Sequence, residues 1–143
     1  MKLSISEILN KLSKLKKKNE KIDWLRKNAS QPLRSVLRLM YDKRVEFLLP
    51  ETPPPWNKNS LVGVEGLFYT EARRLKIFVK GGGYDNLAQA KRESLFIGLL
   101  EDIDNGDADL LANHLISQKP VKGLTLGTLE EAFPDLFTTP IKF

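Results

Sequence analysis

Apolar residues recur at steps of three and four along most of the chain, which is the spacing of one face of an α-helix. The pattern predicts a helix that begins after Ser4, two more before the proline-rich stretch, and later helices over about 65–80, 86–104 and 108–118. A last helix is expected after hydroxyl-bearing helix starts at Thr125 and Thr128. No stretch alternates in steps of two for long enough to indicate a strand. We therefore expect an all-α fold, with six or seven helices around one core in a single compact domain.

The residues at the predicted helix starts support this pattern. Ser4 and Glu7 have the spacing of a capping box, in which each side chain bonds the other residue's backbone N–H. Ser30 is placed to cap the third helix, and Pro32 lies in its first turn, where proline is tolerated. The side chains expected to face the core in the first and third helices are Ile5, Ile8, Leu9, Leu12 and Leu15, and Leu33, Val36, Leu37 and Met40.

The length of 143 residues suits one domain, which we place at residues 1–143. Residues 49–62 are rich in proline, and three consecutive prolines favour an extended segment. A stiff surface crossover is the favoured interpretation, with a ligand for an aromatic groove as the alternative. Trp56 is expected to fold back onto the core. Residues 138–143 are expected to form a C-terminal tail.

Several classes of protein are disfavoured by composition. The chain has no cysteine, so disulfides, thiolate metal sites and a thiol nucleophile are excluded. The first residues lack the apolar segment of a signal peptide, and no apolar run approaches the roughly 20 residues that span a bilayer. We therefore expect no membrane partner and an intracellular, cytoplasmic location.

Positive charge is concentrated at the start of the chain. Residues 1–44 carry 13 Lys or Arg and 4 Asp or Glu, whereas the remaining residues carry 10 and 14. A basic first third suggests a polyanionic partner, most simply nucleic acid. The alternative is a solvated lysine-rich surface that keeps the protein soluble. Charge alone does not separate the two interpretations.

Candidate catalytic and metal-binding residues are sparse. His114 is the only histidine, and its apolar neighbours in the sequence favour a structural role. The acidic turn 102–109 fails as a calcium loop because its glycine comes one place too early and Asn113 stands where a bidentate Glu is required. We expect a helix–helix turn there. The sequence therefore predicts a protein that is not an enzyme and uses no metal or cofactor.

The stretch 119–137, KPVKGLTLGTLEEAFPDLF, combines basic residues with a predicted helix start. Thr128 and Glu131 have capping-box spacing, and Lys119 and Lys122 precede them. Free N–H groups at a helix start beside two lysines suit a phosphate. The alternative is an ordinary last helix with an ordinary cap.

The order of these elements resembles the helical N-terminal DNA-binding domain of ATP-dependent DNA ligases, especially that of T-even-type phages. The opening SEILNKLSKLKKKNEKIDWLRKNASQPLRSVLRLMYD is similar to the first three helices of that domain. The ligase pattern of a glycine, a small hydroxyl residue, a threonine and an apolar helix is matched by Gly123, Thr125, Thr128, Leu129 and Ala132. The aromatic-Pro-x-Leu of the phage version is matched by residues 133–136. The chain also resembles small uncharacterised proteins of T-even-related marine phages, which suggests the infected bacterial cell as its location.

The resemblance implies a domain that grips duplex DNA, intact, nicked or ended, through its sugar-phosphate backbone. One departure is Val121, which stands where ligases often have an arginine, with Lys122 beside it. The adenylation domain and the Lys-x-Asp-Gly motif of ligases are not in this sequence, so ligation is not expected. The expected function is that of a DNA-binding accessory protein in replication or repair. The candidate DNA-binding residues are Lys14, Lys17, Lys18, Arg34, Arg38, Lys43, Arg44, Lys119, Lys122, Thr125 and Thr128.

Two other functions compete with DNA binding. The tail EEAFPDLFTTPIKF resembles the short peptides with which replication proteins dock on sliding clamps. In that case Phe133, Leu136 and Phe137 would contact a replication or transcription protein, and the chain would be an adaptor. Burial of Leu136 and Phe137 would count against this hypothesis. The remaining alternative is a virion component.

Overall fold

All the regular structure in the described part of the chain is helical. The computed structural model describes residues 3–50, 52, 55–58 and 67–140. Within them only an isolated antiparallel bridge, between Phe47 and Val79, has β geometry, so the predicted all-α class is confirmed. The elements are α1 (Ile5–Ser13), α2 (Lys18–Lys27), α3 (Gln31–Tyr41), α4 (Leu67–Glu71), the 3₁₀ segment η1 (Ala72–Phe78), α5 (Gln89–Asp102), α6 (Asn105–Leu110), the π-helical segment η2 (Leu111–Leu115) and α7 (Leu126–Ala132).

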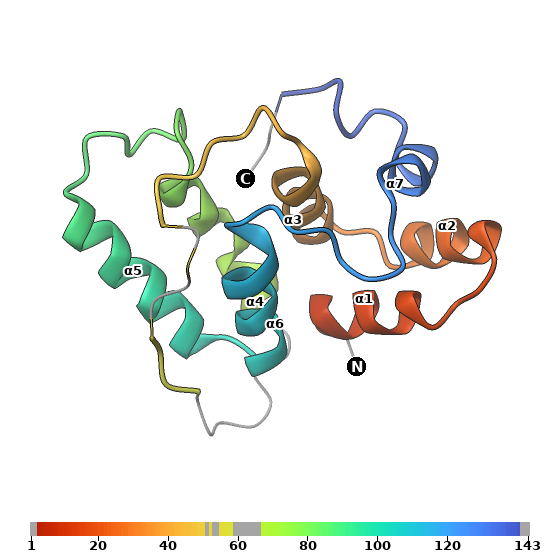
Figure 1. Ribbon diagram of the computed structural model, residues 1–143, viewed down its shortest axis with the longest axis horizontal. Coiled ribbons are helices and arrows are strands. Elements are labelled where there is room, and N and C mark those ends of the chain that lie inside the picture. Colours follow the sequence, from red (N-terminus) through yellow and green to blue (C-terminus); the bar gives the residue numbers. More distant parts are fainter. Residues whose placement is uncertain (1–2, 51, 53–54, 59–66, 141–143) are drawn as a thin grey trace.

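Helix α3 lies at the centre of one compact domain (Figure 1). On one side of it α1, α2 and α7 pack together, and on the other lie α4, η1 and α5. Helix α6 contacts both α1 and α5 and so joins the two sides. The predicted inward residues of α3 are all buried, and those of α1 are buried up to Leu12, because α1 ends at Ser13 and Leu15 lies beyond it.

Two predicted helix caps are present. The Ser4 hydroxyl accepts a hydrogen bond from the Glu7 N–H (3.2 Å), and the Glu7 carboxylate accepts one from the Ser4 N–H (3.3 Å). The Ser30 hydroxyl accepts from the N–H of Leu33 (3.2 Å), with Pro32 in the first turn. These caps depend only on residues three apart, which is why local sequence predicts them.

The predicted single helix over 65–80 is wrong. Residues 65–66 lie outside the described residues, and from residue 67 the chain forms α4 and then η1, which ends at Phe78. The helix stops there because Val79 is extended and lies opposite Phe47. The flanking backbone bonds run from Leu48 N–H to Phe78 C=O (2.8 Å) and from Lys80 N–H to Glu46 C=O (2.9 Å).

The fifth and sixth helices differ from prediction at their ends. Helix α5 is shorter than the expected 86–104 because Ala88 and Ile103, which flank it, have extended backbone. Helix α6 begins before the expected residue 108 because the Asp104 carboxylate accepts from the Asp107 N–H (3.2 Å). The acidic turn is therefore a helix–helix connection with a cap, as expected.

The last helix begins at Leu126, after the first of the two threonines predicted at its start. Thr125, rather than Thr128, is the N-cap: its hydroxyl accepts from the Thr128 N–H (3.2 Å). The predicted capping box with Glu131 is therefore wrong, and Glu131 pairs with Lys18 instead (2.7 Å). Two hydroxyl residues three apart compete for one helix start, and the position of α7 against α2 fixes the outcome.

The expected fold-back of Trp56 is confirmed, since its side chain packs partly buried against the core. Half of the predicted crossover 49–62, including Pro53 and Pro54, lies outside the described residues. The tail 138–143 is described only as far as Pro140.

Candidate nucleic-acid interface

Tyr41, at the end of α3, fixes the loop 118–125 that leads into α7. Its hydroxyl donates to the Leu124 C=O (2.8 Å) and accepts from the Val121 N–H (3.1 Å). Burial raises the pKa of Tyr41 above its usual value, so the phenol stays protonated and keeps both bonds at neutral pH. One buried side chain thus holds two points of the loop.

Gln118 turns the chain from η2 into the same loop. Its φ of 55° lies in the left-handed region, which is unusual for a residue other than glycine. The side-chain amide donates to the C=O groups of Leu39 (3.0 Å) and Asp42 (2.7 Å). These bonds satisfy carbonyls at the C-terminal end of α3, which lack helical partners, and they compensate for the strained backbone.

Gly123 packs the loop directly against the end of α1. Its φ is 82°, and a Cβ there would come within 3.0 Å of the Ser13 Cα, so only glycine fits. Lys21 of α2 donates to the Gly123 C=O (2.6 Å). The loop is therefore tied to α1, α2 and α3.

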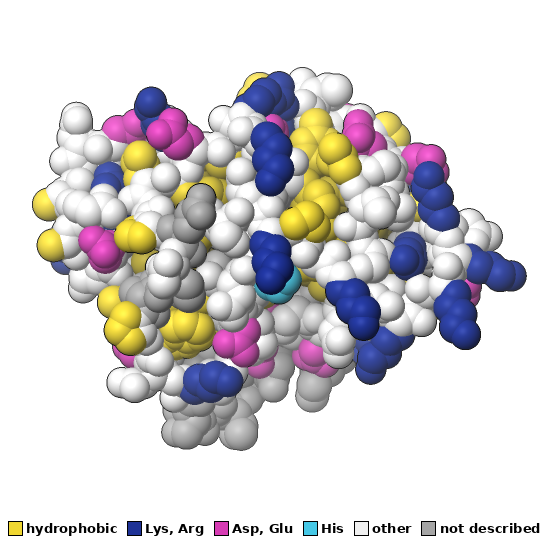
Figure 2. All heavy atoms as spheres, in the orientation of Figure 1, with side chains coloured by type: hydrophobic (Ala, Val, Ile, Leu, Met, Phe, Trp, Pro, Cys, Tyr) yellow, Lys and Arg dark blue, Asp and Glu magenta, His cyan; other side chains and the backbone are white. Residues whose placement is uncertain are grey.

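Five lysines surround this loop, and we call them the loop lysines. Lys119 and Lys122 belong to it and are exposed. Lys43 donates to the Gln118 C=O (3.2 Å), Lys21 bonds Gly123, and Lys14 follows the Ser13 contact. Among the described residues, none of the five forms an ion pair. Lys and Arg side chains gather from the centre to the right-hand edge of the face in Figure 2.

Arg34 and Arg38, two of the candidate DNA-binding residues, do not form an exposed pair. Arg38 is only 7% exposed, and its guanidinium donates to the Asp42 carboxylate (2.8 Å) and to the C=O groups of Leu136 and Thr139. The expectation that it faces solvent is wrong because the segment after α7 covers this face of α3. Arg38 fastens that segment to the core.

Arg34 and Arg44 also bind within the protein. Arg34 pairs with Asp135 (3.2 Å) and lies 4.8 Å from the centre of the Phe133 ring. Arg44 bonds the Asp42 carboxylate (2.9 Å) and the Phe137 C=O (2.8 Å). The candidate arginines thus hold the C-terminal segment.

Asp42 is the centre of this arginine cluster. Hydrogen bonds from Arg44, its main partner, and from Arg38 lower the pKa of Asp42 to about 2, despite its burial. The carboxylate therefore stays charged at every physiological pH. A buried guanidinium needs such a partner, which gives Asp42 a structural role.

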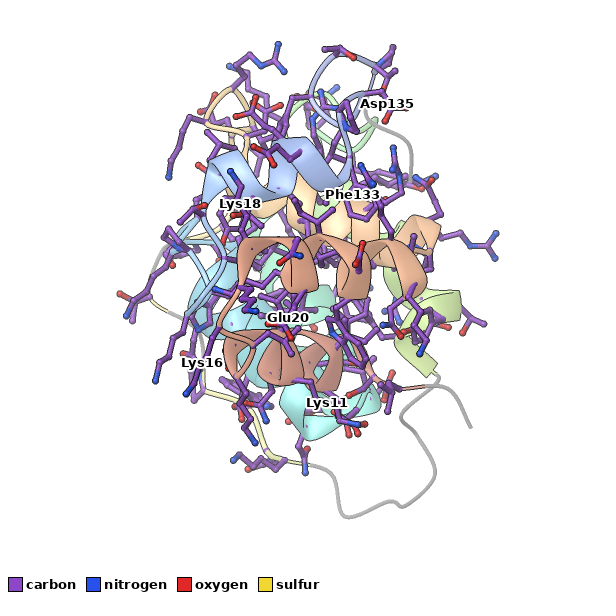
Figure 3. All side chains as sticks on the ribbon, turned by 90° about the vertical axis from the view of Figure 1, so that its right-hand side faces the viewer. Lys11, Lys16, Lys18, Glu20, Phe133 and Asp135 are labelled. Atoms are coloured by element: carbon purple, nitrogen blue, oxygen red, sulfur yellow. The ribbon has the colours of Figure 1, made fainter. Side chains whose placement is uncertain are left out.

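The remaining candidates have mixed positions. Lys17 and Thr125 are exposed, whereas Thr128 is buried and its hydroxyl lies 3.0 Å from that of Thr125. Lys18 pairs with Glu131, with both side chains more than half exposed, so the pair contributes little to stability. In Figure 3, Lys16 and Lys18 lie on the left and Phe133 and Asp135 on the right.

The residues proposed for partner docking belong to the fold. Phe133 and Leu136 are each 4% exposed, and Phe137 packs partly buried against the core. Release of these side chains would expose apolar surface that now contacts α2 and α3. Burial of this segment counts against the clamp-docking hypothesis.

A hollow of about 330 Å³ opens between the end of α3 and the loop. Its wall is mostly apolar, and Leu126 at its edge is 46% exposed. Only Tyr84, among the other described large apolar residues, is comparably exposed. The residues around the hollow are Met40, Tyr41, Lys43, Gln118, Pro120, Leu124, Thr125 and Leu126.

A second hollow, of about 320 Å³, lies on the other side of the loop, between α1 and the α6–η2 segment. Its wall includes Lys122, His114 and small polar side chains of α1. His114 lies in the π-helical segment, and its Nδ1 is 3.1 Å from the Lys119 C=O. As expected, His114 is partly covered by protein.

Sequence reasoning missed four residues of this surface: Lys21, Tyr41, Gln118 and Leu126. The basic composition of residues 1–44 includes Lys21 but does not indicate where it points. The contacts of Tyr41 and Gln118 join positions about 80 apart, and no local pattern signals them.

No group of three or more acidic or histidine side chains within the described residues could hold a metal ion. The helices that the structure describes include none that is long and apolar enough to cross a membrane.

The fold and this face define a small all-helical protein with a lysine-rich surface around one rigid loop. The chain belongs to a family of unknown function, DUF6433, whose sequence profile matches residues 8–120. The match includes four of the loop lysines and ends before Lys122. No curated protein and no solved structure is significantly similar to the chain.

Proposed function

We propose that this protein is a non-catalytic DNA-binding protein that contacts the sugar-phosphate backbone of duplex DNA with little sequence specificity. The observation that supports this most strongly is the convergence of the five loop lysines on one rigid loop. Lys14 and Lys43 lie just after the ends of α1 and α3, Lys21 belongs to α2, and Lys119 and Lys122 belong to the loop. No described acidic residue forms an ion pair with any of them. The resemblance to ligase DNA-binding domains supports the same function.

The physical argument rests on charge and on rigidity. Lysine ammonium groups are compact charges that neutralise phosphates without reading bases. A loop already fixed by Tyr41, Gln118 and Gly123 loses little conformational freedom when it binds. Arginines can read base edges, but the candidates Arg38 and Arg44 bond backbone C=O groups of the C-terminal segment. We therefore expect backbone contacts and weak sequence preference.

The test is fluorescence anisotropy with a labelled 20-mer as intact duplex, nicked duplex and single strand, at two salt concentrations. Binding to duplex is expected to fall steeply with salt, because each phosphate contact contributes about −0.9 to the log–log slope. The ligase resemblance leads us to expect tighter binding to the nick. Lys119→Ala combined with Lys122→Ala should weaken duplex binding about tenfold and make the slope shallower by about 0.9 for each phosphate that is no longer neutralised.

The matched control is Arg73→Ala combined with Lys91→Ala, which removes the same charge from exposed positions on η1 and α5. This variant should retain nearly all of the affinity. Equal losses in the two double variants would show that net charge, and not the loop, drives binding. Absence of binding by the wild type at low salt would overturn the proposal.

A further inference from the structure

We infer that the hollow beside the loop holds one unpaired nucleotide of a DNA strand, so that the protein prefers duplex DNA with an unpaired base. This inference rests on the proposed function and identifies the form of DNA that this surface recognises. It is carried by an apolar hollow that has Lys43 in its wall and Lys119 next to its Pro120.

The wall of the hollow favours a ligand with a flat, apolar surface. Met40 and Tyr41 are buried at the end of α3, while Leu124 and Pro120 come from the loop. The Tyr41 hydroxyl and the Gln118 amide N–H groups already bond backbone groups, so the wall offers few free donors. In a nucleic acid, base faces and sugar rings are the parts that suit such a wall, whereas phosphates are not.

The lysines at the rim of the hollow favour a negatively charged ligand. Lys43 lies at its edge, held 3.2 Å from the Gln118 C=O, and Lys119 precedes Pro120 in the loop. A ligand that fits must be apolar where it meets the wall and anionic near Gln118, where Lys43 and Lys119 lie. A nucleotide has this arrangement, since its base is joined through the sugar to a phosphate.

Leu126 gives the hollow an exposed apolar edge. It follows the N-cap Thr125, lines the hollow together with Lys43 and the apolar side chains of the wall, and leaves 46% of its surface in water. Proteins that bind opened or bent DNA insert apolar side chains such as leucine beside unstacked bases. A paired base in an intact duplex is stacked on both faces, so only an unpaired base can enter the hollow without loss of pairing.

The test compares two labelled 20-bp duplexes, one fully paired and one with a single bulged 2-aminopurine, at one salt concentration. The wild type is expected to bind the bulged duplex about tenfold more tightly, which is the order of one base-stacking contact. The fluorescence of 2-aminopurine should rise on binding, because the base leaves its stacked neighbours.

Leu126→Ser should remove both the preference and the fluorescence change, while the affinity for paired duplex stays within about twofold. The matched control is Tyr84→Ser, at the other exposed large apolar side chain, which should behave as the wild type. Both side chains are exposed, so neither change is expected to unfold the protein, and circular dichroism checks this.

The outcomes separate this inference from the proposed function. Equal binding of the two duplexes, or a preference that survives Leu126→Ser, would overturn the inference and leave the DNA-binding proposal standing. Failure to bind either duplex would overturn both. If sedimentation shows a dimer of the wild type that Leu126→Ser makes monomeric, a second copy occupies the hollow and the inference is wrong.

Discussion

At the scale of single residues, Asp107 is a buried carboxyl without a full set of partners. Its side chain is entirely buried, one oxygen accepts from the Ser6 N–H (2.8 Å), and the other has no hydrogen-bond partner in the described structure. Burial, aided by the charges of Asp104 and Glu7, raises the pKa of Asp107 to about 6. The folded protein therefore favours the protonated form of this group.

Stability should depend on the protonation of Asp107. Because its pKa is higher in the folded state, its stabilising effect is complete below about pH 4 and is lost as pH rises through about 6. As pH rises over that range, ionisation of Asp107 should lower the free energy of unfolding by up to about 3 kcal/mol. Asp107→Asn keeps an acceptor for Ser6 and should remove this loss. Urea unfolding from pH 4.5 to 7.5 measures the free energy of unfolding, and Asp109→Asn, at a partly exposed position, is the control. If the free energies of wild type and Asp107→Asn changed in parallel with pH, Asp107 would not be the group responsible.

Asp42 should behave in the opposite way. Its pKa of about 2 is below that of the unfolded chain, so its contribution is present above about pH 4 and is lost as pH falls through about 2. Asp42→Asn leaves the buried Arg38 without a charged partner and should lower the free energy of unfolding by about 3 kcal/mol at pH 7. Removal of the more exposed Glu71–Arg74 pair by Glu71→Gln should change it by less than about 1 kcal/mol. Similar losses in the two variants, measured by urea unfolding, would refute the structural role of Asp42.

At the scale of elements, the loop 118–125 is held in place by its contacts with α3. Tyr41 bonds the loop at two backbone groups, and Gln118 bonds the end of α3 from the loop side. These contacts are reciprocal, since each element satisfies polar groups that the other leaves free. The lysine-rich face therefore has a fixed shape only while α3 and the loop stay together.

Tyr41→Phe should release the loop. The change leaves the Val121 N–H and the Leu124 C=O without their partner and should lower the free energy of unfolding by about 1–3 kcal/mol. Amide hydrogen exchange should show faster exchange at Val121, and duplex affinity should fall because a mobile loop loses more freedom on binding. The control is Tyr69→Phe, which removes a bond to the Leu3 C=O at a different place. Unchanged exchange at Val121 in Tyr41→Phe would show that the loop is held by other contacts.

Sequence pattern predicted the elements where local chemistry decides them. The caps at Ser4 and Ser30 and the inward faces of α1 and α3 depend on residues three or four apart, and they are confirmed. The predictions are wrong where distant contacts decide. The pairing of Val79 with Phe47 ends η1, and a segment almost 100 residues away in sequence covers Arg38.

In the candidate site, too, local sequence predicted some features and distant contacts decided the others. The basic composition of residues 1–44 indicated a positive surface, and Lys43, Lys119 and Lys122 were among the candidates. The predicted helix-start site at Thr128 is replaced by the Thr125 cap, since two equivalent hydroxyls compete locally and packing selects one. The hollow beside Leu126 could not be predicted, because its two walls meet only in the folded chain.

At the scale of the whole molecule, the fold places the basic first third next to the last helix. Arg26 of α2 donates to the C=O groups of Glu131 (2.9 Å) and Ala132 (3.1 Å), which close the C-terminal end of α7. Lys21 reaches the loop before the same helix. Charge that is concentrated at one end of the sequence is thus assembled with lysines from the other end into one face.

The spread of the loop lysines along the sequence links binding to folding. They run from Lys14 to Lys122, and in an unfolded chain these positions would be far apart and independent. Only the folded protein presents them together, so a polyanion that binds this face binds the native state in preference to the unfolded one. By mass action such a ligand holds the fold together, and the protein is most resistant to unfolding and proteolysis where its ligand is abundant.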